Sequence, residues 1–361
     1  MEFRGTPGLV LPGGGARAAY QVGVLKAVAA ILDGDRLPFT AVAGVSAGSI
    51  NAMAIAQRAD DFQAGVDRLE RLWTQMRASD VYEIDVAQLQ GLILRTHRPL
   101  ALFDNAPLAR LISREIDPPS LERHLASGVL HGLAVTASSY TTGEATTFVQ
   151  SGARAPPITE RRRTTLRTRI GVEHLLASSS LPLLFPAQRI GDEYFVDGSL
   201  RMTAPLSPAI NLGADRLLVI GVRHEALQER PAEAIGPGLG EIGGYTLESV
   251  FAEHLIADIE RAQQINALLE MIPWWRRNHT DRKRIEVMVV RPSEDIGLLA
   301  ARFSTRLPRS IRLFLRTLGG WGSEWKLPSY LLFEGPFGEA LIDLGYRDGL
   351  HHRRALEAFF S

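Results

Sequence analysis

The chain has 361 residues, of which 45 % are hydrophobic, so it can bury a substantial core and is neither disordered nor fibrous. Forty basic and forty acidic side chains balance, so no strong overall field attracts nucleic acid or an anionic membrane. There is no cysteine, which excludes disulfides, thiolate metal sites and cysteine nucleophiles. Because no signal peptide or apolar run of about 18 residues occurs, we expect a cytoplasmic protein without a transmembrane segment and without a nucleic-acid partner.

The first predicted element is a strand over residues 9–11, followed by the glycine turn Gly13-Gly14-Gly15-Ala16-Arg17 and a helix over 18–32. Successive glycines let a backbone approach a ligand and direct N–H groups at it, and the helix dipole favours an anion there. Three interpretations fit this pattern: a cradle for a dinucleotide phosphate, an oxyanion hole, and a plain strand-to-helix turn. For the first, Asp33 and Asp35 follow at about the expected 20 residues, but they precede the second strand instead of ending it.

The second predicted strand begins at Phe39 and breaks at Gly44, and a helical pattern resumes after Ser46. Gly44 and Gly48 flank Ser46 at two residues on each side, which allows a sharp turn that lifts the hydroxyl out at the carboxyl end of the strand. Such a turn is typical of a serine nucleophile, although it also occurs as a structural turn. Because only one strand and helix precede Ser46, two adjacent parallel strands would bring the glycine turn and Ser46 to one sheet edge.

Alternating elements continue along the chain. Two predicted strands, 133–137 and 145–149, pair around a turn, and the strand expected last in the sheet covers 287–290. Amphipathic helices then follow. We therefore expect an α/β catalytic domain over residues 6–292 and a C-terminal helical extension over 293–361 that packs on it.

Four motifs in this order resemble those of the patatin-like phospholipases, or lipid acyl hydrolases, of the bacterial type. They are the glycine turn, Gly44-Val45-Ser46-Ala47-Gly48, the run from Ala177 to Pro186, and Asp197-Gly198, all within residues 8–220. Two positions depart from the family pattern, because Ala18 replaces a glycine and Ser199 replaces a glycine or alanine. Neither departure removes a catalytic group.

The resemblance implies a three-layer α/β/α fold with a mostly parallel central sheet, and hydrolysis of lipid esters, phospholipids above all, without a cofactor or calcium. It also implies a catalytic dyad without histidine, in which Ser46 attacks and Asp197 accepts its proton. The Asp-Gly pairs at 33, 197 and 348 are all expected to form turns, and only Asp197 follows a short strand pattern as well as the family's Phe-Pro. The remaining residues expected in the site are Gly13, Gly14, Gly15 and Ala16 for the oxyanion hole, Arg17 to support the loop or an anionic substrate group, and Gly44, Ala47, Gly48 and Gly198 as supports.

Other interpretations remain open from the residues. A Ser–His–Asp triad would use one of nine scattered histidines, with His174 and His224 the best placed, although we expect surface or capping roles for both. No histidine spacing predicts a metal site. Two other classes of function are a dinucleotide-binding oxidoreductase that uses the Gly13–Gly15 loop, and a lipid-binding module without turnover.

A basic stretch from Arg154 to Arg169 suits peripheral contact with anionic lipid headgroups, or a solvated loop. Trp274 and Trp275 beside two arginines suit a membrane interface, or a packed helix end.

Overall fold

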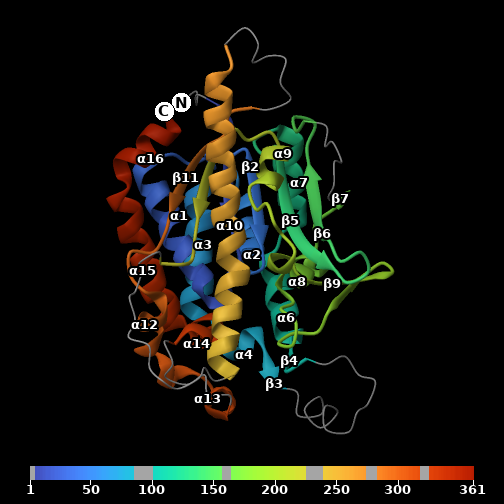
Figure 1. Cartoon of the computed structure of the whole chain (residues 1–361), viewed down its shortest axis with the longest axis vertical. Helices are drawn as coiled ribbons and strands as arrows, with labels where there is room; N and C mark the ends of the chain where they lie inside the picture. The colour runs from blue at the N-terminus through green and yellow to red at the C-terminus, as the bar shows by residue number, and fades with distance from the viewer. Residues whose placement is uncertain (1–4, 85–100, 157–163, 225–238, 274–282, 318–324) are drawn as a thin grey trace.

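The computed structural model describes residues 5–84, 101–156, 164–224, 239–273, 283–317 and 325–361. Its main sheet runs in the order β11-β10-β1-β2-β5-β6-β7, and β9 pairs with β5 and with β8 (Figure 1). The five strands from β11 to β5 are parallel, whereas β6 and β9 run antiparallel to β5. The strands are β1 (Pro7–Leu11), β2 (Ala41–Val45), β5 (Gly132–Ser139), β6 (Ala145–Ser151), β7 (Thr164–Arg167), β8 (Gln188–Ile190), β9 (Glu193–Asp197), β10 (Arg216–Ile220) and β11 (Glu286–Val290), with β3 (Glu83–Ile84) and β4 (Phe103–Asp104) in a small separate pair.

Helices cover both faces of this sheet (Figure 1). Their bounds are α1 (Ala19–Leu32), α2 (Ala47–Ala56), α3 (Phe62–Gln75), α4 (Ala78–Val81), α6 (Ala106–Glu115), α7 (Pro118–Ser127), α8 (Val172–Ser179), α9 (Ser207–Asn211), α10 (Leu239–Met271), α12 (Ile296–Ala301), α13 (Arg309–Thr317), α14 (Lys326–Leu331), α15 (Gly335–His351) and α16 (Arg353–Phe360). Short 3₁₀ turns are η1 (Gly15–Ala18), η2 (Gly198–Leu200) and η3 (Ser304–Arg306). Among the described residues, no helix combines the length and the apolar character needed to cross a bilayer.

Strands β1, β2 and β5 are buried on both faces, and their side chains alternate between two hydrophobic cores. Leu9 and Leu11 of β1 enter the larger core, with α1, α2, α3 and α8, whereas Val10 enters the smaller core, with α9 and α10. The sheet therefore forms the middle layer between two helical layers. This arrangement confirms the predicted three-layer fold with a mostly parallel sheet.

The C-terminal helices pack on the larger core. Helix α15 lies along α1, where a Cβ at Gly345 would overlap the Tyr20 carbonyl oxygen, so glycine permits this close approach. The Tyr20 hydroxyl donates to Asp348 over 2.9 Å across the same contact. A domain boundary at residue 293 stays a prediction.

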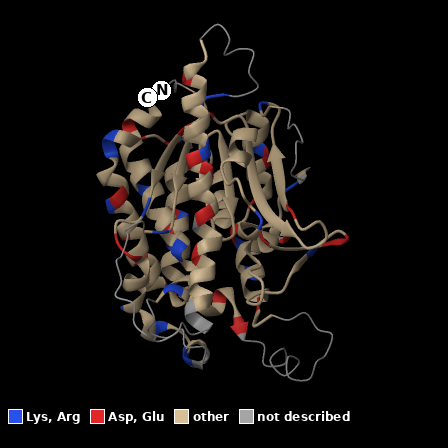
Figure 2. Ribbon diagram, viewed as in Figure 1, with Lys and Arg blue, Asp and Glu red and all other residues tan. Residues whose placement is uncertain are grey.

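Charged residues are scattered over the ribbon in the view of Figure 2 and do not gather on one side of it. This distribution agrees with the equal numbers of acidic and basic residues in the sequence.

Candidate active site

Ser46 lies at the sharp turn between β2 and α2. Its backbone φ of 54° and ψ of −135° is a conformation that non-glycine residues avoid at a cost of about 1–3 kcal/mol. The surroundings hold it there, because its N–H donates to Ser178 Oγ over 2.9 Å and Ser49 Oγ donates to its carbonyl oxygen over 2.6 Å. The strand, turn and helix expected around Ser46 are thus present, and Ser46 is only 3 % exposed.

Position 48 requires glycine because there is no space for a side chain. A Cβ at Gly48 would overlap the carbonyl oxygens of Leu11 and Pro12, at the end of β1. Only glycine therefore lets the first turn of α2 lie against that end. The close approach places the glycine turn beside Ser46, as the expected parallel pairing of β1 and β2 requires.

The glycine turn presents unused amides. The backbone N–H groups of Gly13, Gly14, Gly15 and Ala16 have no acceptor among the described residues. Gly15 has a φ of +54° and lies against the Tyr330 carbonyl oxygen, so the turn is fixed in a shape that only glycine adopts readily. Gly15 and Ser46 line the same cavity, which brings potential oxyanion donors and the serine together.

Asp197 ends β9, and its carboxyl group is fully buried. Oδ1 accepts the N–H of Ser199 over 2.9 Å, whereas Oδ2 has no hydrogen-bond partner among the described residues. Burial raises the pKa of Asp197 to about 6, and the Ser46 hydroxyl and the amide and hydroxyl of Ser199 offset part of that rise. The Ser46 hydroxyl thus lies near enough to influence this carboxyl, but no formed hydrogen bond joins the two side chains. In unliganded sites such catalytic contacts are often long.

The run beginning at Ala177, expected only as a family motif, has direct contacts with the site. Ser178 Oγ accepts the Ser46 N–H and donates to the Thr136 carbonyl oxygen over 2.7 Å, so it ties the turn to β5. The Ser180 carbonyl oxygen accepts the Asp197 N–H over 2.9 Å. Sequence reasoning missed these roles, and its sole signal was the three serines in a row.

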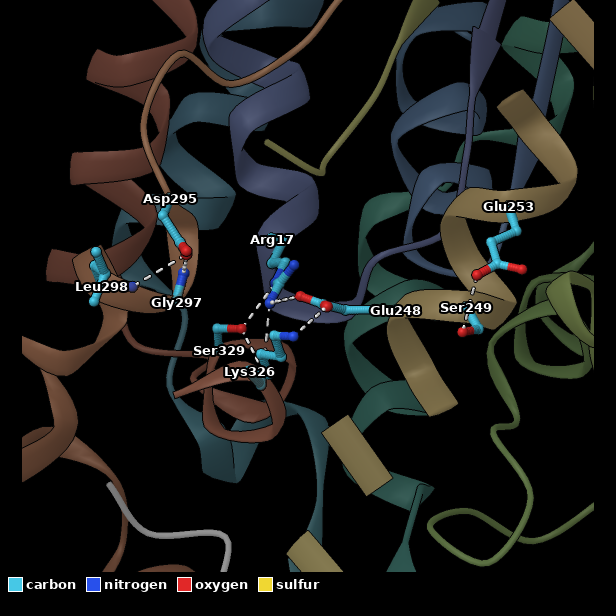
Figure 3. Close-up of polar contacts among 9 residues, drawn as sticks. All are labelled: Arg17, Glu248, Ser249, Glu253, Asp295, Gly297, Leu298, Lys326 and Ser329. Carbon is cyan, nitrogen blue, oxygen red and sulfur yellow. Dashed lines mark hydrogen bonds and ion pairs between the residues drawn. The ribbon is translucent and has the colours of Figure 1, made fainter. Parts of the chain in front are cut away.

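Arg17 extends from the glycine turn into a buried polar network (Figure 3). Its Nε donates to Ser329 Oγ over 2.8 Å, its guanidinium lies 4.0 Å from the Tyr330 ring centroid, and its Nη2 is 3.6 Å from Glu248. Glu248 also pairs with Lys326 over 3.0 Å. Arg17 does not line the cavity at Ser46, so its contacts match support of the loop better than binding of an anionic substrate group.

The wall of the cavity at Ser46 is almost entirely apolar. Helices α2, α3, α6 and α14 and the segment after α8 contribute to it. Its lining includes Ile50, Leu72, Trp73, Met76, Val81, Leu108, Leu111, Ile112, Leu181, Phe185, Leu331 and Phe333. Such a wall, in which Glu115 is the one charged residue from the described part of the chain, suits an alkyl chain.

Neither candidate histidine reaches this cavity. His174 Nδ1 accepts the N–H of Gly171 over 3.0 Å, its ring packs edge-on against Phe148, and burial lowers its pKa. His224 Nδ1 lies 2.8 Å from the Pro292 carbonyl oxygen. The capping role expected for His174 is confirmed, and none of the described histidines lines the cavity.

Two other predictions concern sites away from the cavity. Residues 157–163 of the basic stretch and the tryptophan pair at 274 and 275 lie outside the described residues, so membrane contact stays a prediction. For the dinucleotide hypothesis, Asp33 and Asp35 lie just beyond the C-terminal end of α1, about 20 Å of helix away from the glycine turn. They are not placed to bind a ribose of a ligand on that turn.

Comparison with known families identifies the family of the chain. The family profile described as patatin-like phospholipase matches residues 9–210. The chain belongs to the patatin-like phospholipase family. The matched residues include all four motifs on which the resemblance rests.

Solved structures with a similar fold include human GIVD cytosolic phospholipase A2 in complex with methyl gamma-linolenyl fluorophosphonate, at 14 % identity and a TM-score of 0.44. The patatin-like chain covers 58 % of that protein's length, and the alignment covers 98 % of the chain itself. VipD from Legionella pneumophila is similar at 13 % identity and a TM-score of 0.30, with 90 % of this chain and 66 % of VipD covered. No curated protein sequence matches the chain.

Proposed function

We propose that this patatin-like protein hydrolyses carboxylic esters of lipids, most of all phospholipids, with Ser46 as nucleophile and Asp197 as base. One observation carries the proposal. Ser46 and the glycine turn with its unused amides meet at one end of an apolar cavity, and a buried carboxylate oxygen without a partner lies close to Ser46.

In the first step, Ser46 Oγ attacks the ester carbonyl carbon while Asp197 Oδ2 accepts its proton. The carbonyl oxygen becomes an oxyanion and accepts hydrogen bonds from the amides of Gly14, Gly15 and Ala16, with Gly13 shaping the turn. The alcohol or lysophospholipid then leaves with the proton from Asp197. Water attacks the acyl-enzyme in the second step, again with Asp197 as base.

A carboxylate of ordinary pKa is a weak base for a serine hydroxyl, and burial reduces this mismatch. With a pKa of about 6, Asp197 is mostly ionised at pH 7, yet it holds a proton more strongly than an exposed aspartate does. Its free Oδ2 is available for the proton of Ser46. Nothing in this scheme requires an imidazole.

The supporting residues fix the distances between these groups. A Cβ at Gly198 would overlap the Thr136 carbonyl oxygen. A Cβ at Gly44 would likewise overlap the backbone of Gly48 and Ser49. Ala47 continues from Ser46 into α2 and lines the cavity. Arg17 holds the glycine turn against α14 through Ser329 and Tyr330.

The test combines labelling with hydrolysis. A fluorophosphonate probe should label wild-type protein at Ser46 alone, and Ser46→Ala should lose both labelling and turnover of phospholipid vesicles and p-nitrophenyl esters. Ser113→Ala, at an exposed serine of α6, is a matched control and should behave as wild type. Label on a different residue, or phospholipid turnover that survives Ser46→Ala, contradicts the proposal.

A further inference from the structure

A serine near the proposed dyad has a buried hydroxyl group without a hydrogen-bond partner among the described residues. Ser179 ends α8, is 8 % exposed and lines the cavity together with Ser46. Its Oγ is buried and has no hydrogen-bond partner among the described residues. Buried hydroxyls normally have a partner, because leaving one without costs about 1–3 kcal/mol, so an unpaired one in a cavity wall needs an explanation.

The neighbours of Ser179 place it at the reacting centre. On one side Ser178 accepts the N–H of Ser46, and on the other side the Ser180 carbonyl accepts the N–H of Asp197. The hydroxyls of both neighbours are already satisfied, by Thr136 and Leu176 respectively. Ser179 alone of the three has a hydroxyl left for an occupant of the cavity.

The sheet order shows from which side Ser179 approaches Ser46. Strand β2 lies between β1, which carries the glycine turn, and β5, on which α8 and β9 pack. Ser179 and Asp197 therefore approach Ser46 from the β5 side, opposite the glycine turn. If the oxyanion faces the glycine turn, the oxygen of the leaving group faces the side of Asp197, which must protonate it.

We infer that the Ser179 hydroxyl donates a hydrogen bond to the alkoxy oxygen of the bound ester and stabilises the charge that develops there as the alcohol leaves. Ser179 would then contact the substrate directly and hold the leaving oxygen near the proton on Asp197. The bonds made and broken stay those of the ester hydrolysis proposed above, on which this inference rests.

The inference predicts a dependence on the leaving group. An alkyl alcohol leaves poorly and needs help from a donor, whereas p-nitrophenolate leaves readily without it. Ser179→Ala should therefore lower kcat/KM for an alkyl butyrate by about 10- to 100-fold, the range for a lost hydrogen bond to a charged oxygen. For p-nitrophenyl butyrate, which carries the same acyl group, the loss should stay within about threefold.

Ser180→Ala is the matched comparison, since it removes a neighbouring hydroxyl that bonds within the helix and should leave the ratio of the two rates as in wild type. Ser179→Thr should restore the alkyl ester, and Ser179→Val, of the same shape without the hydroxyl, should not. This pair keeps the test valid if Ser179→Ala folds poorly.

Equal losses on both esters would assign Ser179 a purely structural role and overturn the inference, as would no loss on either. A wild-type protein without Ser46-dependent hydrolysis of either ester would instead refute the proposed function itself, and the inference with it.

Discussion

Asp197→Asn separates the catalytic role of this side chain from its effect on stability. The amide has nearly the same shape as the carboxylate, and its oxygen can still accept the Ser199 N–H. However, it cannot accept the Ser46 proton, so kcat should fall by about 100- to 10,000-fold, the range for a lost general base. The same substitution should stabilise the fold at neutral and higher pH.

The size of this stabilisation follows from the pKa. Burial raises the pKa of Asp197 from 3.8 to about 6, so the folded state binds the proton more tightly than the unfolded state does. The stability that this proton binding by Asp197 contributes to the fold is fully present below about pH 4, and it is lost as the pH rises through about 6. At 1.36 kcal/mol per pKa unit, wild type should lose about 3 kcal/mol of unfolding free energy by pH 8, and Asp197→Asn should not.

Urea denaturation at pH 4 and at pH 8 measures this difference, with Ser46→Ala as an inactive variant that keeps the carboxyl. The difference in unfolding free energy between Asp197→Asn and wild type should shift in favour of the variant by roughly 2–3 kcal/mol between these pH values.

The acid limb of wild-type kcat/KM should lie near pH 6, where a histidine would also place it. For that reason His174→Ala is the control: it should retain activity within several-fold. A pH-independent difference in stability would refute the burial argument, and an inactive but folded His174→Ala would refute the dyad.

Three further predictions concern the surroundings of the dyad. Gly14→Val places a Cβ 2.6 Å from Val222 Cγ2 and should lower kcat by about 100- to 1000-fold with KM little changed in steady-state assays, whereas a loss of affinity alone would favour a phosphate cradle. Leu111→Trp narrows the cavity and should shift the preferred p-nitrophenyl ester toward shorter acyl chains, unlike Leu298→Trp at an exposed position outside it; an unchanged preference would place the acyl chain elsewhere. Arg17→Ala removes the hydrogen bond to Ser329 and the contact with the Tyr330 ring, while Glu248 keeps its ion pair with Lys326. The substitution should cost about 2 kcal/mol of unfolding free energy in urea, and a cost below about 0.5 kcal/mol would contradict the support of the loop by Arg17.

Local sequence patterns made much of the fold and the sharp turn at Ser46 predictable. The apolar runs that form β1, β2 and β11 are short and bounded by turn residues, and the glycines around Ser46 encode the turn within five positions. Because parallel neighbours end at the same sheet edge, the meeting of the glycine turn with Ser46 also followed from the sequence. The Asp-Gly pair at 348 shows the limit of such reasoning, since it lies inside α15 and not in a turn.

Contacts between distant segments could not be predicted in this way. Ser178 lies 132 positions from Ser46, and no periodicity indicates that its hydroxyl accepts the Ser46 N–H. The raised pKa of Asp197 depends on complete burial, which comes from the packing of β5, β9 and α8 together. Secondary-structure propensity and residue spacing describe one helix or strand at a time. They therefore cannot predict a property that arises where three such elements pack together.

The C-terminal helices contribute directly to the proposed site. The carbonyl oxygen of Tyr330 fits against Gly15, and the side chains of Leu331 and Phe333 complete the apolar wall that starts at Ser46. The Arg17 network fastens α14 to the glycine turn at the same place. The segment beyond the matched family region thus shapes the volume in which an acyl chain would lie, while the groups proposed to break the ester all come from within that region. The apolar wall accordingly comes from both parts of the sequence, whereas the groups proposed for the chemistry come from one, so substitutions in α14 should alter which ester is hydrolysed before they alter how.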